Sequence, residues 1–219
     1  MKETYWDDQT RSEAAEAMLT ELFPAGQKRA KAMSPPAAAL LALDLQQYFL
    51  DPASHAFIPS GPPIVPAIKN LAQLFAANGR PVIYSQQLNN RENAGSMAGW
   101  WRNLITADHP HSSLSPLLDI SKGEILKKPQ YDAFYQTDLA ERLARYGTRQ
   151  VVIGGVMTHL CCETTARSAF VQGFEVFFLV DGTASYRRDY HMATLRNLGH
   201  GFATLVTAQQ VIRSFEGQE

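Results

Sequence analysis

The chain has 219 residues, of which 45% are hydrophobic and 19% are charged, and 20 basic residues nearly balance 21 acidic ones. This length suits one globular domain with a sizeable core, and the near-neutral charge gives no bulk attraction to nucleic acid or to an anionic membrane. The N-terminus lacks a basic segment followed by an apolar one, and no stretch approaches about 20 apolar residues, so we expect neither a secretory signal nor a membrane span.

Residues 1–36 are predicted to form an N-terminal helical arm and linker ahead of the main domain. The segment "SEAAEAMLTELF" spaces apolar residues at helical intervals among glutamates. Ser12 is the expected N-cap, and Pro24 and Gly26 are expected to end the helix. A short amphipathic helix needs a surface to cover, and packing on its own domain or on a partner subunit is equally consistent with the sequence.

Residues 37–219 alternate between apolar runs and amphipathic segments, with an irregular stretch at 88–121. The apolar runs predict strands at 37–44, 80–86, 123–128, 149–156, 174–182 and 202–208. The amphipathic segments predict helices at 63–79, 137–147, 160–173, 189–201 and 209–216. This alternation predicts a three-layer α/β/α sandwich with a mainly parallel, six-stranded Rossmann-like sheet. In such sheets the functional site lies at the carboxyl ends of the strands, near the switch point.

Charged residues follow two of the predicted strands. Asp44 ends the first apolar run, and a buried carboxylate there needs a partner or a raised pKa; the alternative is a helix N-cap. Lys127 and Lys128 end the third run, and strand alternation turns one of them inward. An inward lysine would pair with a buried carboxylate, whereas two exposed edge lysines are the alternative.

The only two cysteines, Cys161 and Cys162, open the helix predicted after the fourth strand. Adjacent cysteines build no disulfide framework and no CxxC motif is present, so we expect a reduced, cytoplasmic protein. Helical spacing groups Cys162 with the small residues Ala166 and Ala169, which suits packing on the sheet. Cys161 faces elsewhere, and the helix N-terminus and a nearby lysine would lower the pKa of its thiol. The alternative for Cys161 is an inert small hydrophobe.

Three blocks of this chain together resemble the isochorismatase-like (cysteine hydrolase) superfamily, which includes nicotinamidases, N-carbamoylsarcosine amidases and isochorismatases. The blocks are "ALLALDLQQYF", "KKPQYDAFYQTDL" and "GGVMTHLCCETTARSAFVQGFEVFFLVDGTAS", in the family's order and spacing. The resemblance covers the chain from about residue 37 to its C-terminus. It implies that Asp44, Lys128 and Cys161 are the catalytic residues, with Cys161 as the nucleophile of the G-V-x-T-x-x-C motif.

The resemblance also implies features around the nucleophile. A cis peptide bond between Val156 and Met157 would turn backbone N–H groups, including that of Cys161, toward a developing oxyanion. The implied substrate-binding residues are Gln87, Trp101, Tyr131, Val156, Met157 and His159. We further expect a homo-oligomer, a dimer or tetramer, that acts on a small molecule.

Two departures from the family bear on the reaction. Nicotinamidases carry a D-x-H metal motif after the second strand, where this chain reads "YSQQLNN", and the pair His109 and His111 is weak metal evidence. We therefore expect no metal and no other cofactor, which argues against nicotinamidase activity. Gln87, Trp101, His159 and the N-terminal arm look like the isochorismatase branch. That branch, however, has glycine at the position of Cys161 and cysteine at that of Cys162.

The leading hypothesis is a metal-independent thiol hydrolase that cleaves an amide or carbamoyl C–N bond through an acyl-enzyme on Cys161. Asp44 would take the thiol proton and later give it to the leaving amine, while Lys128 would hold the aspartate and favour the thiolate. The alternative is isochorismatase-type hydrolysis of a vinyl ether with Asp44 as general acid. A third interpretation is a non-catalytic oligomerisation or regulatory module that retains the fold.

Overall fold

A computed structural model of the chain describes residues 1–27 and 29–217, so residue 28 of the expected linker and residues 218–219 of the expected domain lie outside the described ranges. Six strands form a single sheet in the order β3-β2-β1-β4-β5-β6, and every neighbouring pair is parallel. The strands are β1 (Ala38–Leu43), β2 (Val82–Gln87), β3 (Glu124–Lys128), β4 (Gln150–Val156), β5 (Glu175–Ala184) and β6 (Thr204–Val206). The predicted six-stranded fold is confirmed, and the sheet is wholly parallel.

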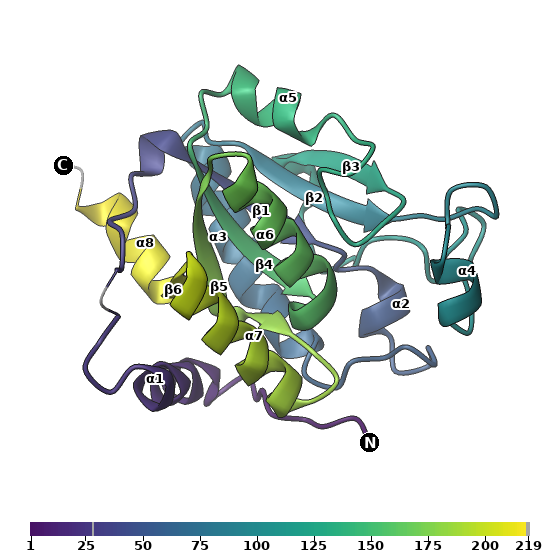
Figure 1. The fold of residues 1–219 in the computed structure, drawn as a ribbon, viewed down its shortest axis with the longest axis horizontal. Helices are drawn as coiled ribbons and strands as arrows, with labels where there is room; N and C mark the ends of the chain where they lie inside the picture. Colours follow the sequence, from purple (N-terminus) through teal and green to yellow (C-terminus); the bar gives the residue numbers. More distant parts are fainter. Residues whose placement is uncertain (28, 218–219) are drawn as a thin grey trace.

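Helices cover both faces of this sheet, which is why its central strands are apolar throughout. All residues of β1 and β4 are buried, as expected for parallel strands between two helical layers. Helices α3 (Val65–Ala77) and α8 (Ala208–Glu216) pack on each other against one face. Helices α6 (Glu163–Val171) and α7 (Arg188–Gly201) lie on the opposite face, and α5 (Leu139–Arg145) lies near β3 (Figure 1).

The N-terminal arm packs on its own chain. Helix α1 (Arg11–Leu22) contacts β5 and α7, and it buries Ala15 and Met18. The helix begins one residue before the expected N-cap, and Thr10 precedes its first turn without a side-chain cap. Ser12 is therefore inside the helix, because the chain already turns helically at Arg11, whose backbone N–H donates to the Asp7 carbonyl.

Three short helical segments differ from the sequence-based expectation. The helix expected at 160–173 is split into a π-helical turn, Thr158–Cys162, and α6, which starts at Glu163. Helices α2 (Gln47–Leu50) and α4 (Met97–Trp100) form in stretches where no helix is predicted. Each is a single turn, too short for a periodic pattern to reveal.

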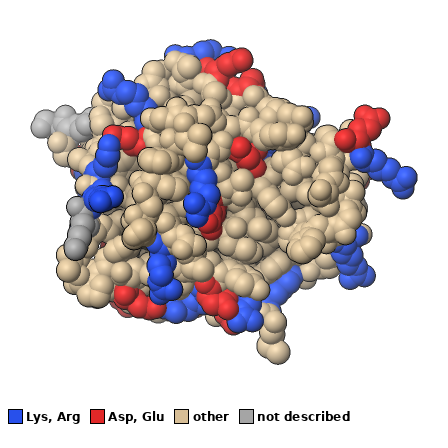
Figure 2. Space-filling view, in the orientation of Figure 1, with Lys and Arg blue, Asp and Glu red and all other residues tan. Residues whose placement is uncertain are grey.

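The surface carries both charge signs. Figure 2 shows lysine and arginine interspersed with aspartate and glutamate over the visible face, with no extended field of one sign. No helix within the described ranges is both long and apolar enough to cross a membrane.

Candidate active site

The candidate site lies where the strand order reverses, between β1 and β4. Asp44 directly follows β1, Lys128 is the last residue of β3, and Cys161 sits in the π-helical turn after β4. These three residues, the buried triad from here on, meet at the carboxyl edge of the sheet because parallel strands end on the same side. The edge faces α2 and α4 in Figure 1.

The two charged members of the buried triad form an ion pair away from water. Lys128 Nζ lies 2.7 Å from Asp44 Oδ2, and both side chains are 0% exposed. Ser85 Oγ donates to Asp44 Oδ1 at 2.6 Å, and Lys128 Nζ donates to the Gln130 carbonyl at 2.8 Å. Burial alone would lower the pKa of Lys128, but the adjacent Asp44 carboxylate contributes most to raising it above its usual value, so the ammonium is retained.

The backbone bends sharply where Asp44 leaves the sheet. Asp44 has φ 51°, a left-handed conformation that is uncommon for a non-glycine residue and that clusters at functional sites. Gly155, which pairs with Leu43 in the β1–β4 register, has φ 120°. A Cβ at Gly155 would overlap the backbone of Leu43. The glycine of the G-V-x-T-x-x-C motif therefore lets β1 approach closely just before Asp44.

The two adjacent cysteines have different surroundings. Cys162 packs in the hydrophobic core, whereas Cys161 lines a cavity. Burial, and then the Asp44 charge, raises the pKa of the Cys161 thiol, and Lys128 offsets only part of that rise. The sequence-based expectation of a lowered pKa is therefore wrong, because it left out the complete removal of this sulfur from water. Burial and the Asp44 charge therefore favour the neutral thiol over the thiolate, and a base that takes its proton would assist its reaction.

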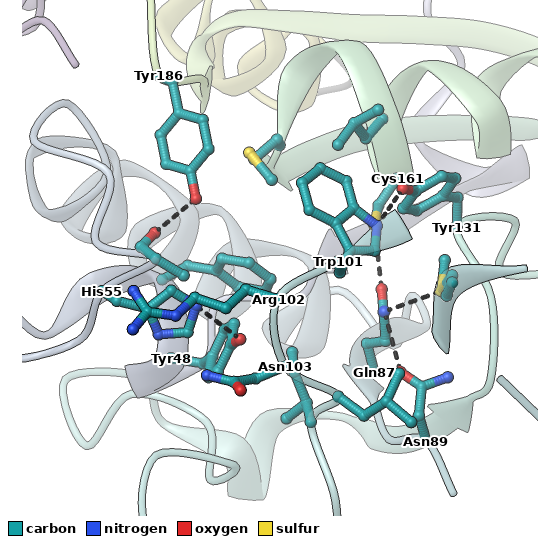
Figure 3. Close-up of a pocket in the computed structure, with 17 residues that line it drawn as sticks. Tyr48, His55, Gln87, Asn89, Trp101, Arg102, Asn103, Tyr131, Cys161 and Tyr186 are labelled. Carbon is teal, nitrogen blue, oxygen red and sulfur yellow. Dashed lines mark hydrogen bonds between the residues drawn. The ribbon is translucent and has the colours of Figure 1, made fainter. Parts of the chain in front are cut away.

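The cavity above Cys161 has a volume of about 170 Å³, which limits its ligands to small molecules. Most of its lining is aromatic or aliphatic (Figure 3). We call Tyr48, His55, Trp101, Arg102 and Tyr186 the cavity wall. Apart from the histidine, Arg102 is the one titratable cationic side chain among the described lining residues.

Four of the six residues expected to bind substrate lie on this cavity: Gln87, Trp101, Tyr131 and Met157. Trp101 Nε1 donates to the Tyr131 hydroxyl at 2.6 Å, which fixes both rings. The other two do not line it. Val156 is fully buried at the end of β4, and the peptide bond from Val156 to Met157 is cis.

His159 also points away from the cavity. Its Nδ1 lies 2.7 Å from Ser185 Oγ, and its ring packs on Tyr190 with the centroids 4.8 Å apart. Burial lowers the pKa of His159, which favours the neutral ring. In this arrangement, His159 supports the turn that carries Cys161 from the far side.

Part of the cavity wall is held by the first residues of the chain, which no pattern in the sequence marks as part of a site. Lys2 Nζ donates to the carbonyls of His55 and Phe57, each at 2.7 Å, and lies 4.4 Å from the centroid of the Tyr186 ring. The Tyr186 hydroxyl in turn donates to the Ala56 carbonyl at 3.1 Å. Lys2 therefore ties together two wall segments that are distant in sequence.

Comparison with known proteins places the chain in a family. The isochorismatase domain profile matches residues 38–210. The chain belongs to the isochorismatase family. This membership confirms the resemblance drawn from the three sequence blocks, and the matched region contains all three members of the buried triad.

Several curated and solved proteins are similar to this family member. "Nicotinamidase 3" of Arabidopsis thaliana is 35% identical over 185 residues, which cover 82% of this chain and 89% of that protein. The phenazine biosynthesis protein PhzD of Pseudomonas fluorescens is 27% identical and covers 82% of this chain and 87% of its own length. A solved cysteine hydrolase from Pseudomonas syringae has a TM-score of 0.80 at 24% identity, and the match covers 85% of this chain and 96% of that one.

A solved pyrazinamidase of Pyrococcus horikoshii in complex with zinc is also similar, with a TM-score of 0.70 at 25% identity over 78% of this chain and 99% of that one. The described residues here do not fit such a metal, since no three histidine, cysteine, aspartate or glutamate side chains among them gather as a ligand set. After β2 the chain offers the amides of Gln87 and Asn89, and His111 pairs with Asp51 at 3.6 Å.

Proposed function

We propose that this isochorismatase-family protein hydrolyses the C–N bond of a small amide through an acyl-enzyme on Cys161. The observation that carries the proposal is a thiol at the bottom of a small apolar cavity, beside a buried Asp44–Lys128 ion pair. A curated nicotinamidase at 35% identity supports the same class of reaction. An inert cysteine would need no charge pair beside it, and burying such a pair is costly.

The reaction uses Asp44 twice. As Cys161 Sγ forms a bond to the carbonyl carbon, the thiol proton moves to Asp44, because the raised pKa of the thiol leaves no preformed thiolate. Backbone N–H groups of the turn after β4 donate hydrogen bonds to the carbonyl oxygen as negative charge develops on it. The C–N bond then breaks, and Asp44 gives its proton to the leaving nitrogen.

The acyl-enzyme is resolved by water. Asp44, again a carboxylate, takes a proton from the attacking water and returns it to the sulfur as the S–C bond breaks, which releases the carboxylic acid. Lys128 keeps its charge throughout and holds Asp44 in place. Tyr131 and Trp101, joined by their hydrogen bond, form one side of the space that the substrate occupies.

The adjacent cysteines supply a matched test. Wild type, Cys161→Ala and Cys162→Ala are assayed for ammonia release from nicotinamide and N-carbamoylsarcosine and for pyruvate release from isochorismate. We expect ammonia release that Cys161→Ala abolishes and Cys162→Ala largely retains, because Cys162 serves packing. Full turnover by Cys161→Ala would contradict the covalent mechanism. Nicotinamide is included because the curated relative argues for it although the metal ligands are missing.

The second candidate function is vinyl-ether hydrolysis with Asp44 as general acid. It is favoured by the similarity to PhzD, to a probable isochorismatase of Pseudomonas chlororaphis at 26% identity and to an isochorismatase of Bacillus subtilis at 28% identity. In that reaction the thiol is dispensable. Pyruvate release from isochorismate that survives alkylation of Cys161 would support this candidate and contradict the first.

We also propose that the protein forms a dimer or tetramer in a reducing compartment such as the cytoplasm. The free cysteines support a reducing compartment, and the resemblance to the family implies the assembly. Light scattering coupled to size-exclusion chromatography tests the assembly, and a monomer at micromolar concentration would contradict it.

A further inference from the structure

A relay of side-chain amides runs from a backbone carbonyl to the candidate nucleophile. Asn89 Nδ2 donates to the Pro129 carbonyl at 2.5 Å. Gln87 Nε2 donates to Asn89 Oδ1 at 3.2 Å and approaches Met97 Sδ at 3.6 Å. Gln87 Oε1 accepts from Cys161 Sγ at 3.5 Å. Figure 3 shows Gln87 lying between Asn89 and Cys161.

The relay has a fixed direction. The two ends of a glutamine or asparagine amide are told apart only by their partners, and here the first partner is unambiguous. A carbonyl can only accept, so Asn89 must turn its NH₂ group toward Pro129 and its oxygen toward Gln87. Gln87 must then turn its own NH₂ group toward Asn89, which leaves Gln87 Oε1 facing Cys161.

The backbone of Gln87 is held as firmly as its side chain. Gln46 Oε1 accepts from the Gln87 N–H at 2.9 Å, and Gln46 Nε2 donates to the Gln87 carbonyl at 3.1 Å. Gln46 Nε2 also donates to the Ser112 carbonyl at 2.7 Å, and Gln46 is fully buried. The Gln87 backbone is therefore fixed, and its side-chain oxygen stays beside the sulfur as long as Gln87 Nε2 keeps its hydrogen bond to Asn89.

A fixed, buried acceptor such as Gln87 Oε1 favours ligands that bring a hydrogen-bond donor to it. In the free enzyme the thiol S–H satisfies Gln87 Oε1, and this donor is lost when the proton moves to Asp44. A substrate with an N–H on its reacting group replaces the lost donor. An ester or vinyl ether of the same shape offers only oxygen, and it leaves the acceptor unpaired in a site that excludes water.

We propose that the relay of Pro129, Asn89 and Gln87 makes the site selective for reacting groups that carry an N–H, as in primary carboxamides and carbamoyl compounds, over esters and vinyl ethers. Asn89 is the positioning residue that sets this polarity. The inference rests on the proposed function in naming the substrate class. Its test, however, does not require turnover, because alkylation of Cys161 reports on the same acceptor.

Iodoacetamide and methyl iodoacetate are the probes. In both, the sulfur forms a bond to the methylene carbon and iodide leaves, but only the first carries an N–H donor. Rates at Cys161 are measured by peptide mass spectrometry, and each ratio is divided by the ratio for glutathione, which corrects for intrinsic reactivity. We expect wild type to favour iodoacetamide by about tenfold after this correction.

Three variants decide the origin of the preference. Asn89→Leu is expected to bring the corrected ratio to within about twofold of unity, since Gln87 is then free to reverse its amide. Asn89→Asp still accepts from Gln87 and is expected to keep the preference. Gln86→Leu is the matched control: its half-buried side chain bonds the Ser112 carbonyl rather than Cys161. Thermal unfolding verifies that each variant is folded.

The possible outcomes distinguish a failure of the proposed selectivity from a failure of the proposed amide hydrolysis. A wild-type ratio equal to that of glutathione overturns the proposal, as does a ratio that falls equally in Asn89→Leu and Gln86→Leu. If the ratio behaves as expected while no amide is hydrolysed, the relay stands and the proposed function fails.

Discussion

The buried triad and the cavity wall are built in opposite ways. The triad stands on strand ends, its two charges are fully buried, and every member comes from the region matched by the family profile. The wall comes from loops and the single-turn helix α2, retains exposed side chains such as Arg102, and is held by Lys2, which lies outside that region. The proposed reaction chemistry thus rests on the rigid sheet, whereas the proposed substrate selection rests on segments that can vary without disturbing it.

The largest expected effect is that of replacing Asp44, whose carboxylate acts as a base in the proposed reaction and also raises the pKa of the Cys161 thiol. Asp44→Asn removes the general base, so we expect kcat to fall by about 10² to 10⁴-fold. In alkylation the thiol can lose its proton to solvent before it reacts, so the same change should accelerate iodoacetamide labelling of Cys161 at pH 8, because removing the Asp44 charge lowers the pKa of the thiol. Slower labelling in a folded variant would contradict the electrostatic account.

The ion pair of the triad is expected to affect stability more than any wall residue. Lys128→Met leaves the Asp44 charge buried without a partner, which should lower the free energy of unfolding by about 3–5 kcal/mol in urea titrations. The double variant Asp44→Leu/Lys128→Met should recover much of that loss. Lys31→Met is the control, since the Lys31–Glu175 pair is 61% and 37% exposed and such pairs contribute only about 0–1 kcal/mol. Equal losses for the two lysines would contradict the account.

His191 joins the N-terminal arm to the turn that carries Cys161, and it should make the stability of the protein depend on pH. It is buried against Trp6 and Tyr5, and its Nδ1 lies 3.0 Å from Thr158 Oγ1. Burial, and then the Arg188 charge, lowers the pKa of His191 from 6.5 to about 3. Between pH 6.5 and about 3, His191 is therefore protonated in the unfolded chain but neutral in the folded chain. The free energy of unfolding consequently falls as the pH decreases through this range.

This effect reaches up to about 1.4 kcal/mol per pH unit for one proton. His191→Asn cannot titrate, so its free energy of unfolding should depend less steeply on pH between 6 and 4 than that of wild type. The measurement is urea unfolding at several pH values. Identical slopes for the two proteins would mean that His191 is protonated in the folded state.

The smallest expected effect lies in the wall. Lys2→Ala frees the carbonyls of His55 and Phe57 and the ring of Tyr186, so KM should rise a few-fold, by about the worth of one or two hydrogen bonds, while kcat stays nearly constant. A fall in kcat alone would place the arm in the chemistry rather than in the wall. Lys31→Ala again serves as the surface control.

The same contrast explains what the sequence could predict. A charge that interrupts a long apolar run is conspicuous in a sequence, so Asp44, one inward-facing lysine of the pair 127–128 and a mainly parallel sheet could be predicted. The family resemblance then selected Lys128. Wall residues such as His55 and Tyr186 meet only through tertiary folding, and no local pattern marks them. The thiol pKa was misjudged for a related reason: a helix start and a lysine are visible in a sequence, whereas complete burial is not.

His159 illustrates a second limit of prediction. Family position marked it as a pocket residue, but the π-helical turn places its ring against Ser185 and Tyr190. A 3.6-residue periodicity does not hold in a π-helical turn. Side-chain directions around Cys161 therefore required the structure.

The most direct test of the central claim is to trap the acyl-enzyme. Wild type is mixed with the amide that the substrate panel identifies, quenched in acid, and examined by intact-protein and peptide mass spectrometry, with hydroxylamine added in parallel to intercept the thioester as a hydroxamic acid. We predict an adduct of one acyl group on the peptide that carries Cys161, absent in Cys161→Ala and present in Cys162→Ala. Hydrolysis that proceeds without adduct or hydroxamate, and survives in Cys161→Ala, would contradict the account.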